Sequence, residues 1–425
     1  MLLIYKILIF ISYPFFILAI FIRTLLKKEN KIRYKEKIFP LAFNSKRNSN
    51  KKLIWFHASS IGEFLSIIPL IDRLNLQYKN LEFLITTVTL SSANLFKKKF
   101  HNYNNINHRF IPFDVTFLVN SFLEEWKPNI VCFVDSEIWP NFLFQIKKKS
   151  IPLILLNGRI TKKTFKRWNT FPKFAKKVFN NFDLCLASSE ESKNNLINLN
   201  AKNTRYLGNL KFCSKINFTK LIDENESILN NFKVWCAAST HEGEEDILIK
   251  SHIILRNTIK NIKTIIIPRH IDRVASIKSL ADNHHLNSQI IDNEEKINRD
   301  SEIIIVNSFG VLDKYYRYCK VVLIGKSLLK KFELVGGQSP IDAAKFGCKI
   351  LHGPYVYNFF EIYEFLNSMG ISFQINNEKN LAKKLEEILK IEDRSNNSNK
   401  DFLENYGEKI LKETLDSLKN YINTN

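Results

Sequence analysis

Short apolar runs alternate with longer amphipathic runs through most of the chain, and this alternation restricts the possible folds more than any other feature. In the first half, the apolar runs cover residues 53–56, 82–87, 130–134, 152–156 and 184–187. Helical patterns lie between them, for example at 62–75, 115–126 and 138–148. Buried strands that alternate with helices are typical of parallel βαβ units, so we expect an α/β fold.

A second series of apolar runs follows a polar, Asn-rich stretch at 214–232, which we interpret as a linker. The runs of this series cover residues 233–238, 263–267, 303–306, 320–324 and 348–351. We therefore predict two Rossmann-like domains, followed by a loop at 393–400 and a helix; the predicted segments are 37–215, 216–400 and 401–425. Ligands are expected in a cleft between the two domains, at strand carboxyl ends and helix N-termini.

The N-terminal segment predicts a membrane anchor. Residues 1–22 are apolar except for Lys6, and the uninterrupted part, 7–22, is shorter than the roughly 20 residues of a spanning helix. A cluster of cations follows at Arg23, Lys27, Lys28, Lys31, Arg33, Lys35 and Lys37. Such a cluster keeps the following chain on the cytoplasmic side and can grip anionic lipid head groups. A signal peptide fits less well because no small-residue cleavage site precedes the cluster, so we predict an uncleaved anchor over 1–36.

Charge and cysteine usage narrow the possible partners. The formal net charge of +21 suggests an anionic membrane or substrate, although many lysines of so Lys-rich a chain can simply be solvated surface. Sequence motifs of nucleic-acid-binding domains are missing, so we expect no nucleic acid partner. The six cysteines are widely spaced and form no C-x-x-C pair, which indicates buried thiols in a reducing compartment.

The stretch WFHASSIGEFLSIIP, residues 55–69, carries the strongest indication of a site. An apolar strand ends at a small-residue turn, and Gly62 and Glu63 open an apolar helical run. Ser59 and Ser60 are suited to capping this helix, and Gly62 permits close approach of another molecule. We predict that Glu63 is a general base; the alternative is a first-turn acid that only favours the helix dipole.

Further polar groups follow other strands of the first half. Asp135 and Glu137 come directly after the run 130–134, and Asn157-Gly158-Arg159 ends the next strand. Lys211 closes this half of the chain, where an ammonium group could reach a substrate anion.

The second half opens on a polar turn after its first strand. Ser239 and Glu242 match a capping box, and His241 and Glu242 are candidate substrate contacts. The turn begins like an H-E-x-x-H zinc helix, but Glu245 stands where the second histidine would be, so we predict no metal site.

Two other segments of the second half suit a phosphorylated ligand. Pro268 and Arg269 end the strong strand 263–267, where a guanidinium can pair with a phosphate, although a surface arginine is the alternative. The turn at Gly336-Gly337 leads to Pro340 at the start of a helix and is expected to offer free N–H groups to an anion. Asp342 follows and is placed to receive a ribose hydroxyl.

Taken together, these motifs resemble the 3-deoxy-D-manno-octulosonic acid (Kdo) transferase family. The segments that carry the resemblance are HASSIGE, ITTVTLSSA, IPFD, DSEIWPN, NGRI, GNLKF, AASTHEGEE, PRH, GGQSP and GPYVYNFFEI. The resemblance implies a GT-B fold and an inner-membrane enzyme of lipopolysaccharide assembly, without metal or cofactor. It also implies transfer of Kdo from CMP-Kdo to a lipid A disaccharide precursor (lipid IVA), with inversion of the anomeric centre.

The resemblance also implies roles for individual residues. Glu63 matches the family's base, and Asp135 and Lys211 match its two transition-state-stabilising positions. The positions that match its CMP contacts are Pro268, Arg269, Phe309, Gly310, Val311, Ser339, Pro340, Ile341 and Asp342.

This chain departs from the family pattern at several places. Asp135 replaces a glutamate, the usual G-G-H-N-P-x-E reads Gly-Gly-Gln-Ser-Pro-Ile-Asp, and a G-G-S strand end reads Gly325-Lys326-Ser327. Because most of these changes fall on the nucleotide side, two alternatives stay open. One is a related transferase with another nucleotide-activated sugar, and the other is a non-catalytic membrane-bound binding protein.

Overall fold

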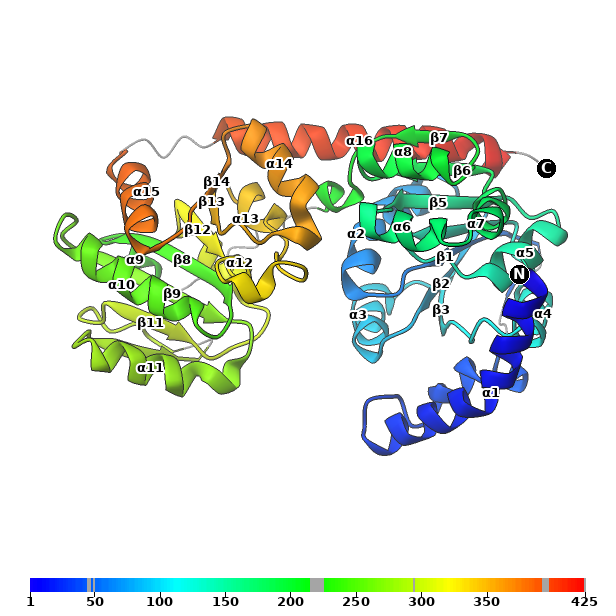
Figure 1. The fold of residues 1–425 in the computed structure, drawn as a ribbon, viewed down its shortest axis with the longest axis horizontal. Coiled ribbons are helices and arrows are strands. Elements are labelled where there is room, and N and C mark those ends of the chain that lie inside the picture. Colours follow the sequence, from blue (N-terminus) through cyan, green and yellow to red (C-terminus); the bar gives the residue numbers. More distant parts are fainter. Residues whose placement is uncertain (44–46, 49, 215–224, 293–294, 392–396, 424–425) are drawn as a thin grey trace. The chain divides into compact units, whose positions relative to one another are not determined.

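The chain folds into two compact units. The computed structural model describes residues 1–43, 47–48, 50–214, 225–292, 295–391 and 397–423. Unit 1 comprises Met1–Lys215 with Tyr406–Asn425, and unit 2 comprises Ile216–Asn405. Each unit contains a seven-stranded sheet of parallel strands (Figure 1).

The sheet of unit 1 has the strand order β3-β2-β1-β4-β5-β6-β7, so the direction of winding reverses between β1 and β4. Its strands are β1 Lys52–His57, β2 Leu81–Thr87, β3 Ile106–Phe110, β4 Ile130–Val134, β5 Leu153–Gly158, β6 Leu184–Ala187 and β7 Thr204–Tyr206. The helices are α1 Leu2–Leu25, α2 Ile61–Gln77, α3 Leu90–Phe100, α4 Thr116–Trp126, α5 Pro140–Lys148, α6 Lys162–Asn169, α7 Pro172–Phe179, α8 Glu190–Asn198 and the 3-10 turn η3 Leu210–Cys213. In such open sheets, ligands bind where the winding reverses.

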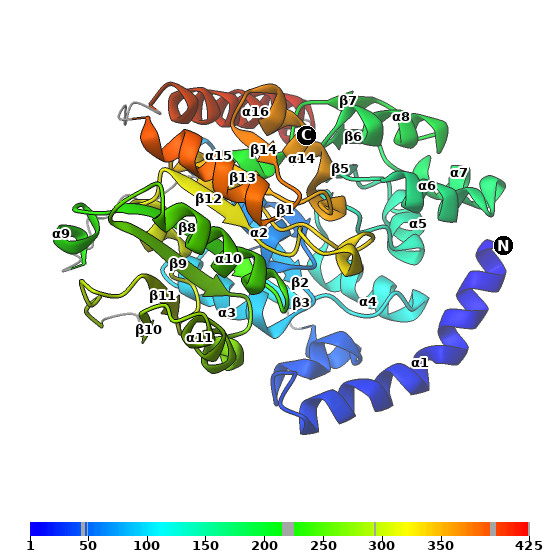
Figure 2. The ribbon, with the colours of Figure 1, turned by 60° about the vertical axis from the view of Figure 1, so that its left-hand side comes forward.

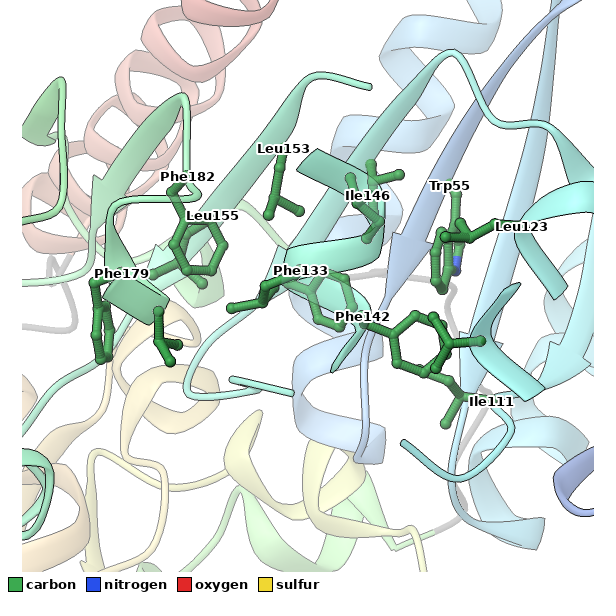
Figure 3. Packing of buried hydrophobic residues seen from close by; sticks show 14 of the residues in the cluster. Trp55, Ile111, Leu123, Phe133, Phe142, Ile146, Leu153, Leu155, Phe179 and Phe182 are labelled. Atoms are coloured by element: carbon green, nitrogen blue, oxygen red, sulfur yellow. The ribbon is translucent and has the colours of Figure 1, made fainter. Parts of the chain in front are cut away.

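Alternating residues of β1 fill the two faces of this sheet. The ring of Trp55 lies 5.7 Å from that of Phe133 on β4 and 5.5 Å from that of Phe142 on α5, in the core shown in Figure 3. The next residue, Phe56, points to the other face and stacks on Phe83 of β2 at 6.4 Å. Period-2 alternation with large apolar groups on both faces is the pattern of a parallel sheet covered by helices on both sides.

Unit 2 repeats this plan with the order β10-β11-β9-β8-β12-β13-β14. Its strands are β8 Lys233–Thr240, β9 Ile262–Pro268, β10 Ser288–Ile291, β11 Ile303–Val306, β12 Val321–Ile324, β13 Lys349–His352 and β14 Ser372–Gln374. The helices are α9 Glu226–Leu229, α10 Glu244–Arg256, α11 Val274–Asn283, α12 Leu312–Tyr316, α13 Ile341–Lys345, α14 Phe360–Ser368 and α15 Glu378–Lys390. α10 and α15 lie side by side over one face (Figure 2), and Ser251 Oγ donates to the carbonyl of Glu378 at 3.0 Å.

The predicted α/β class with two Rossmann-like units is confirmed, and every predicted strand is present. The four edge strands of the two sheets, β3, β7, β10 and β14, were not predicted. The final helix, α16, spans Asn397–Asn423, so the loop predicted at 393–400 is wrong for residues 397–400. Residues 215–224 of the predicted linker and 393–396 of the predicted loop lie outside the described residues.

Helix α1 lies along unit 1 and does not project from it. One helical stripe, formed by Tyr5, Ile9, Tyr13 and Phe16, faces the protein. Tyr5 Oη donates to Asp114 Oδ2 at 2.8 Å near the start of the helix. Tyr13 Oη donates to the carbonyl of Ile38, and the ring of Phe16 stacks on Phe113 at 4.6 Å.

The opposite face of α1 is apolar and exposed. It carries Leu3, Ile4, Ile7, Leu8, Phe10, Ile11, Phe15, Leu18, Phe21, Ile22 and Leu25. Among the described residues, α1 is the one helix that is long and apolar enough to cross a membrane, with a mean hydropathy of 2.2.

Part of the basic segment after α1 is used inside the protein. Glu29 pairs with Arg23 at 2.8 Å and with Lys37 at 2.6 Å, and Arg33 pairs with Glu36 at 2.7 Å. Lys37 is buried, and its ammonium also donates to the carbonyl of Val88. Of the cations that were predicted to be able to grip lipid head groups, Arg33 and Lys37 therefore have their charges satisfied by the fold.

Candidate functional site

Glu63 lies where β1 gives way to α2, at the point where the winding of the unit 1 sheet reverses. Ser60 is the N-cap of α2, and its Oγ accepts the N–H of Glu63 at 3.3 Å. The same hydroxyl donates to Glu63 Oε1 at 2.9 Å, and the N–H of Ser59 donates to Glu63 Oε2 at 2.7 Å. The predicted cap is confirmed, and the carboxylate is held over the first turn by two directed hydrogen bonds.

The electrostatic surroundings prepare Glu63 to accept a proton near neutral pH. Burial and then the negative charges of Asp135 and Glu137 raise its pKa to about 7, against the opposing hydrogen bonds from Ser60 and Ser59. A carboxylate with a pKa in this range is a much better proton acceptor than an ordinary glutamate. The cap alone would lower the pKa of a first-turn acid, so burial and the two neighbouring carboxylates outweigh it here.

Asp135 follows β4, the neighbour of β1 in the sheet. Its backbone is in the left-handed region with φ at 61°, its N–H donates to the carbonyl of Leu156, and its carbonyl accepts the N–H of Arg159. Burial raises the pKa of the Asp135 carboxyl, and the charges of Lys211 and Arg159 oppose that effect. Strained backbone of this kind persists only where neighbouring structure fixes it, and it re-aims the side chain at the strand end.

Lys211 reaches the same place from η3. Asn157, at the end of β5, accepts the N–H of Leu210 at 2.9 Å, and Asn209 accepts the N–H of Lys211 at 3.0 Å. These two bonds hold the turn over the strand ends, and Lys211 Nζ lies 3.9 Å from Asp135 Oδ2. The structure therefore brings Glu63, Asp135 and Lys211 together.

Two further groups belong to this cluster that the sequence analysis did not assign to the site. Glu137 Oε2 accepts from Trp139 Nε1 at 2.7 Å and lies 3.6 Å from Nε2 of the buried His57. Burial alone would raise the pKa of Glu137, but these interactions together hold it below the ordinary value. Glu137 thus stays ionised beside Glu63. The two acids of the segment Asp135-Ser136-Glu137 were the sequence signal from which its place in the site could have been predicted.

In unit 2, two of the predicted CMP-binding segments follow neighbouring strands. Pro268 ends β9, Arg269 is exposed, and its N–H donates to the carbonyl of Thr240 at 3.0 Å. Within the described part of the chain, the Arg269 guanidinium makes no ion pair, so it is available to an anion. β11 pairs with β9, and after it the Phe309 side chain is 65% exposed. Gly310 has φ at 76°, and Val311 is buried.

The glycine turn that precedes the third segment, 339–342, differs from expectation in its backbone hydrogen bonds. Gly336 donates its N–H to the carbonyl of Phe332 at 2.6 Å, and Gly337 donates to the carbonyl of Lys326 at 2.7 Å. The prediction that this glycine turn offers free N–H groups is therefore wrong for both glycines.

Around the start of α13, the four predicted nucleotide contacts are exposed to different degrees. Pro340 is the N-cap of α13 and not its first residue. Ile341 is buried, Ser339 is half-buried and Asp342 is exposed. α12, which follows Val311, packs against α13, so the second and third segments are neighbours.

The predicted capping box of Ser239 and Glu242 is also wrong. Gly243, with φ at 91°, is the N-cap of α10, and the buried Glu244 takes the capping role. Its carboxylate accepts backbone N–H groups from His241 at 2.9 Å and from Lys326, Ser327 and Leu328 at 2.7, 2.8 and 3.0 Å. It therefore fastens the turn after β12 to the turn after β8.

Within the described ranges, no group of three or more His, Cys, Asp or Glu side chains is arranged to hold a metal ion. Glu245, which stands where the second histidine of a zinc motif would be, pairs with Arg273 at 2.7 Å and accepts from Thr240 Oγ1 at 2.8 Å.

Comparisons with known proteins match this geometry to a family. Residues 33–214 match the family described as 3-deoxy-D-manno-octulosonic-acid transferase (kdotransferase). The 3-deoxy-D-manno-octulosonic acid transferase of Rickettsia bellii is 30% identical over 411 residues, which cover 96% of this chain and 94% of that protein. The chain belongs to this family. The Haemophilus influenzae enzyme of the same name is 26% identical over 385 residues, or 88% of each chain.

The fold of this Kdo transferase family member is shared with solved structures of low sequence similarity. A glycosyltransferase from Rickettsia africae superimposes with a TM-score of 0.56 at 13% identity, covering 88% of this chain and all of that one. The UDP-GlcNAc 2-epimerase from Neisseria meningitidis gives a TM-score of 0.57 at 13% identity over 87% of this chain. The predicted GT-B class is thus confirmed, and membership of the transferase family confirms the assignment as a glycosyltransferase. The arrangement of the two units across a shared cleft stays a prediction.

Proposed function

We propose that this glycosyltransferase moves Kdo from CMP-Kdo to a hydroxyl of the lipid A disaccharide precursor, lipid IVA, with inversion and without a metal ion. The observation that carries the proposal is the cluster at the reversal of the unit 1 sheet. There, Glu63 has a pKa near neutrality, two anchored oxygens and an ionised neighbour, Glu137.

In the proposed reaction, the Glu63 carboxylate takes the proton of the acceptor hydroxyl as that oxygen attacks the anomeric carbon of Kdo. The bond from this carbon to the phosphate oxygen of CMP breaks, and CMP leaves as an anion. A single displacement from the opposite face inverts the anomeric centre. Lys211, held 3.9 Å from Asp135, supplies positive charge beside the base, and the exposed Arg269 pairs with the CMP phosphate.

The protein is proposed to act at the cytoplasmic face of the inner membrane, with α1 as an uncleaved anchor. Tyr5 and Tyr13 hydrogen-bond to unit 1 near the start and the middle of α1, so this helix cannot leave the protein to cross a bilayer without breaking both bonds. We infer that α1 lies in the plane of the membrane, with its exposed apolar face among the acyl chains. A lipid acceptor then reaches unit 1 from the bilayer.

A second candidate is a transferase of the same mechanism that uses another nucleotide-activated sugar. The observation that favours it is the glycine turn, whose amide groups at Gly336 and Gly337 are bonded internally. Donor recognition must then depend more heavily on Arg269 and on the exposed Phe309.

The test is incubation of the purified protein with CMP-Kdo and lipid IVA, followed by mass spectrometry of the lipid. We expect a mass increase of one or more Kdo residues with the parent protein and none with Glu63→Gln, which still binds CMP in calorimetry. The matched control is Glu190→Gln, because Glu190 is also a first-turn acid after a serine N-cap in unit 1, and it lies on α8. Normal transfer by Glu63→Gln would refute the role of the base, and transfer only from another donor would support the second candidate.

A further inference from the structure

The hairpin of α6 and α7 forms a strongly basic surface of unit 1. From Arg159 to Phe182 the sequence contains eight cations and no acidic residue. Seven of them lie on the two helices and are exposed: Lys162, Lys163, Lys166, Arg167, Lys173, Lys176 and Lys177. Among the described residues, only Lys162 has a carboxylate nearby, that of Glu191 at 4.0 Å. The charge of this surface is therefore almost entirely uncompensated by the protein.

The hairpin is rigidly mounted, with its apolar side turned inward. Trp168 of α6 packs edge-on against Phe179 of α7 with ring centroids 5.2 Å apart. Ala175 and Val178 are buried in the core of unit 1. Because the apolar residues within both helices pack against the core, the cations do not cover an apolar surface, and all seven are exposed.

The exception is Phe171, which joins the two helices and is 54% exposed. An aromatic ring at the turn of a basic hairpin is suited to insertion at the level of lipid head groups. The same hairpin touches α1, since the ring of Tyr5 lies 6.2 Å from that of Phe174 on α7. Helix α7 thus lies beside the N-terminal part of α1 (Figure 1).

We propose that the α6–α7 hairpin is a docking surface for an anionic lipid bilayer, with its lysines and Arg167 on the head groups and Phe171 inserted between them. This inference rests on the proposed attachment of α1 to the membrane and names the lipid chemistry that completes it. The two parts contribute differently: α1 supplies apolar area that is indifferent to lipid charge, and the hairpin supplies selectivity for negative charge. The proposal also explains how the protein can bind anionic lipid although Arg33 and Lys37, two cations expected at the head groups, are engaged in internal ion pairs.

The experiment is sedimentation of the full-length protein with vesicles of neutral phosphatidylcholine, and with vesicles that also contain phosphatidylglycerol. The test variant carries Lys173→Gln, Lys176→Gln and Lys177→Gln. The control variant carries Lys379→Gln, Lys383→Gln and Lys390→Gln on α15 of unit 2, which removes the same charge from another exposed helix. At roughly a fivefold loss in partitioning for each lysine, the test variant is expected to bind anionic vesicles about a hundredfold more weakly than the control.

On neutral vesicles, we expect both variants to bind like the parent protein. In 1 M salt, where the screening length falls to about 3 Å, the difference on anionic vesicles should vanish. Equal binding of test and control variants to anionic vesicles would overturn the hairpin proposal while leaving α1 attachment intact. Failure of the parent to bind either vesicle would instead refute the attachment itself. Loss of transfer by the test variant with acceptor in neutral micelles would assign the hairpin to the acceptor and so overturn the bilayer proposal.

Discussion

Replacing Glu63 by glutamine should make unit 1 more stable at alkaline pH while abolishing transfer, because the site holds a carboxylate where a neutral group is preferred. The folded-state pKa of Glu63 is raised to about 7, above its ordinary 4.5. Its contribution to stability is therefore fully present below pH 4.5 and is lost as pH rises through 7. Glutamine cannot ionise and does not lose this contribution.

The size of the effect follows from the two pKa values. At about 1.4 kcal/mol per pH unit, the interval from 4.5 to about 7 corresponds to about 3 kcal/mol. Glutamine also loses one of the two acceptor oxygens that bind the Ser59 N–H and the Ser60 hydroxyl, which costs about 1 kcal/mol. That cost is nearly independent of pH, so the variant should be slightly less stable than the parent at pH 4.5 and more stable at pH 8.5.

The assay is thermal or urea unfolding in neutral detergent, followed by tryptophan fluorescence at a series of pH values. Four of the five tryptophans, Trp55, Trp126, Trp139 and Trp168, belong to unit 1, so the signal reports mainly on the unit that carries Glu63. The stability difference between Glu63→Gln and the parent should change by about 3 kcal/mol across the range. Glu190→Gln, the exposed control, should show no such change. A difference for Glu63→Gln that is constant with pH would refute the reasoning about its environment.

Three other substitutions test separate contacts. Lys211→Ala removes the ammonium 3.9 Å from the buried Asp135 and should lower transfer at least tenfold, with a destabilisation of about 1–3 kcal/mol measured by urea unfolding. Tyr5→Phe removes the bond to Asp114 and should cost about 1 kcal/mol, and limited proteolysis should then cleave near α1 sooner; an unchanged cleavage rate would contradict the docking of this helix. Glu244→Gln disturbs four bonds from backbone N–H groups and should destabilise unit 2 by about 2–4 kcal/mol without changing the unfolding of unit 1; a loss under 1 kcal/mol would show that the fastening is dispensable.

Much of the fold was predictable because interior strands of a covered parallel sheet must be apolar on both faces. The runs that became β1, β4 and β9 are of this kind. The four missed strands are all at sheet edges, where a strand pairs with only one neighbour in its sheet. β3, with the sequence Ile-Asn-His-Arg-Phe, alternates buried and half-buried residues, and β7 is mostly exposed. An edge strand exposes unpaired backbone groups, and short length and polar side chains keep it from pairing with another chain. A short polar segment has no hydrophobic pattern from which a strand can be predicted.

The site was predictable as far as its residues lie at the carboxyl ends of strands, where ligands bind in open α/β sheets. Glu63, Asp135 and Lys211 were each identified from a strand or turn signal, and the structure places them together. The capping of α10 could not be predicted from the sequence. The choice of Glu244 over Glu242 depends on the positive φ of Gly243 and on N–H groups from residues 326–328. The prediction of free N–H groups in the glycine turn was wrong for a similar reason, because these groups bond to carbonyls that lie close only after folding.

The return of the chain to unit 1 through α16 has a consequence for biosynthesis. Cys213, two residues beyond Lys211, donates its thiol to the carbonyl of Gly407, and Phe212 packs on Tyr406 at 5.4 Å. The turn that presents Lys211 is thus supported by residues that the ribosome makes only after the whole of unit 2. A nascent chain could fold the nucleotide unit while the base-bearing unit still lacks this support, so catalytic competence should appear late in translation, with the emergence of α16.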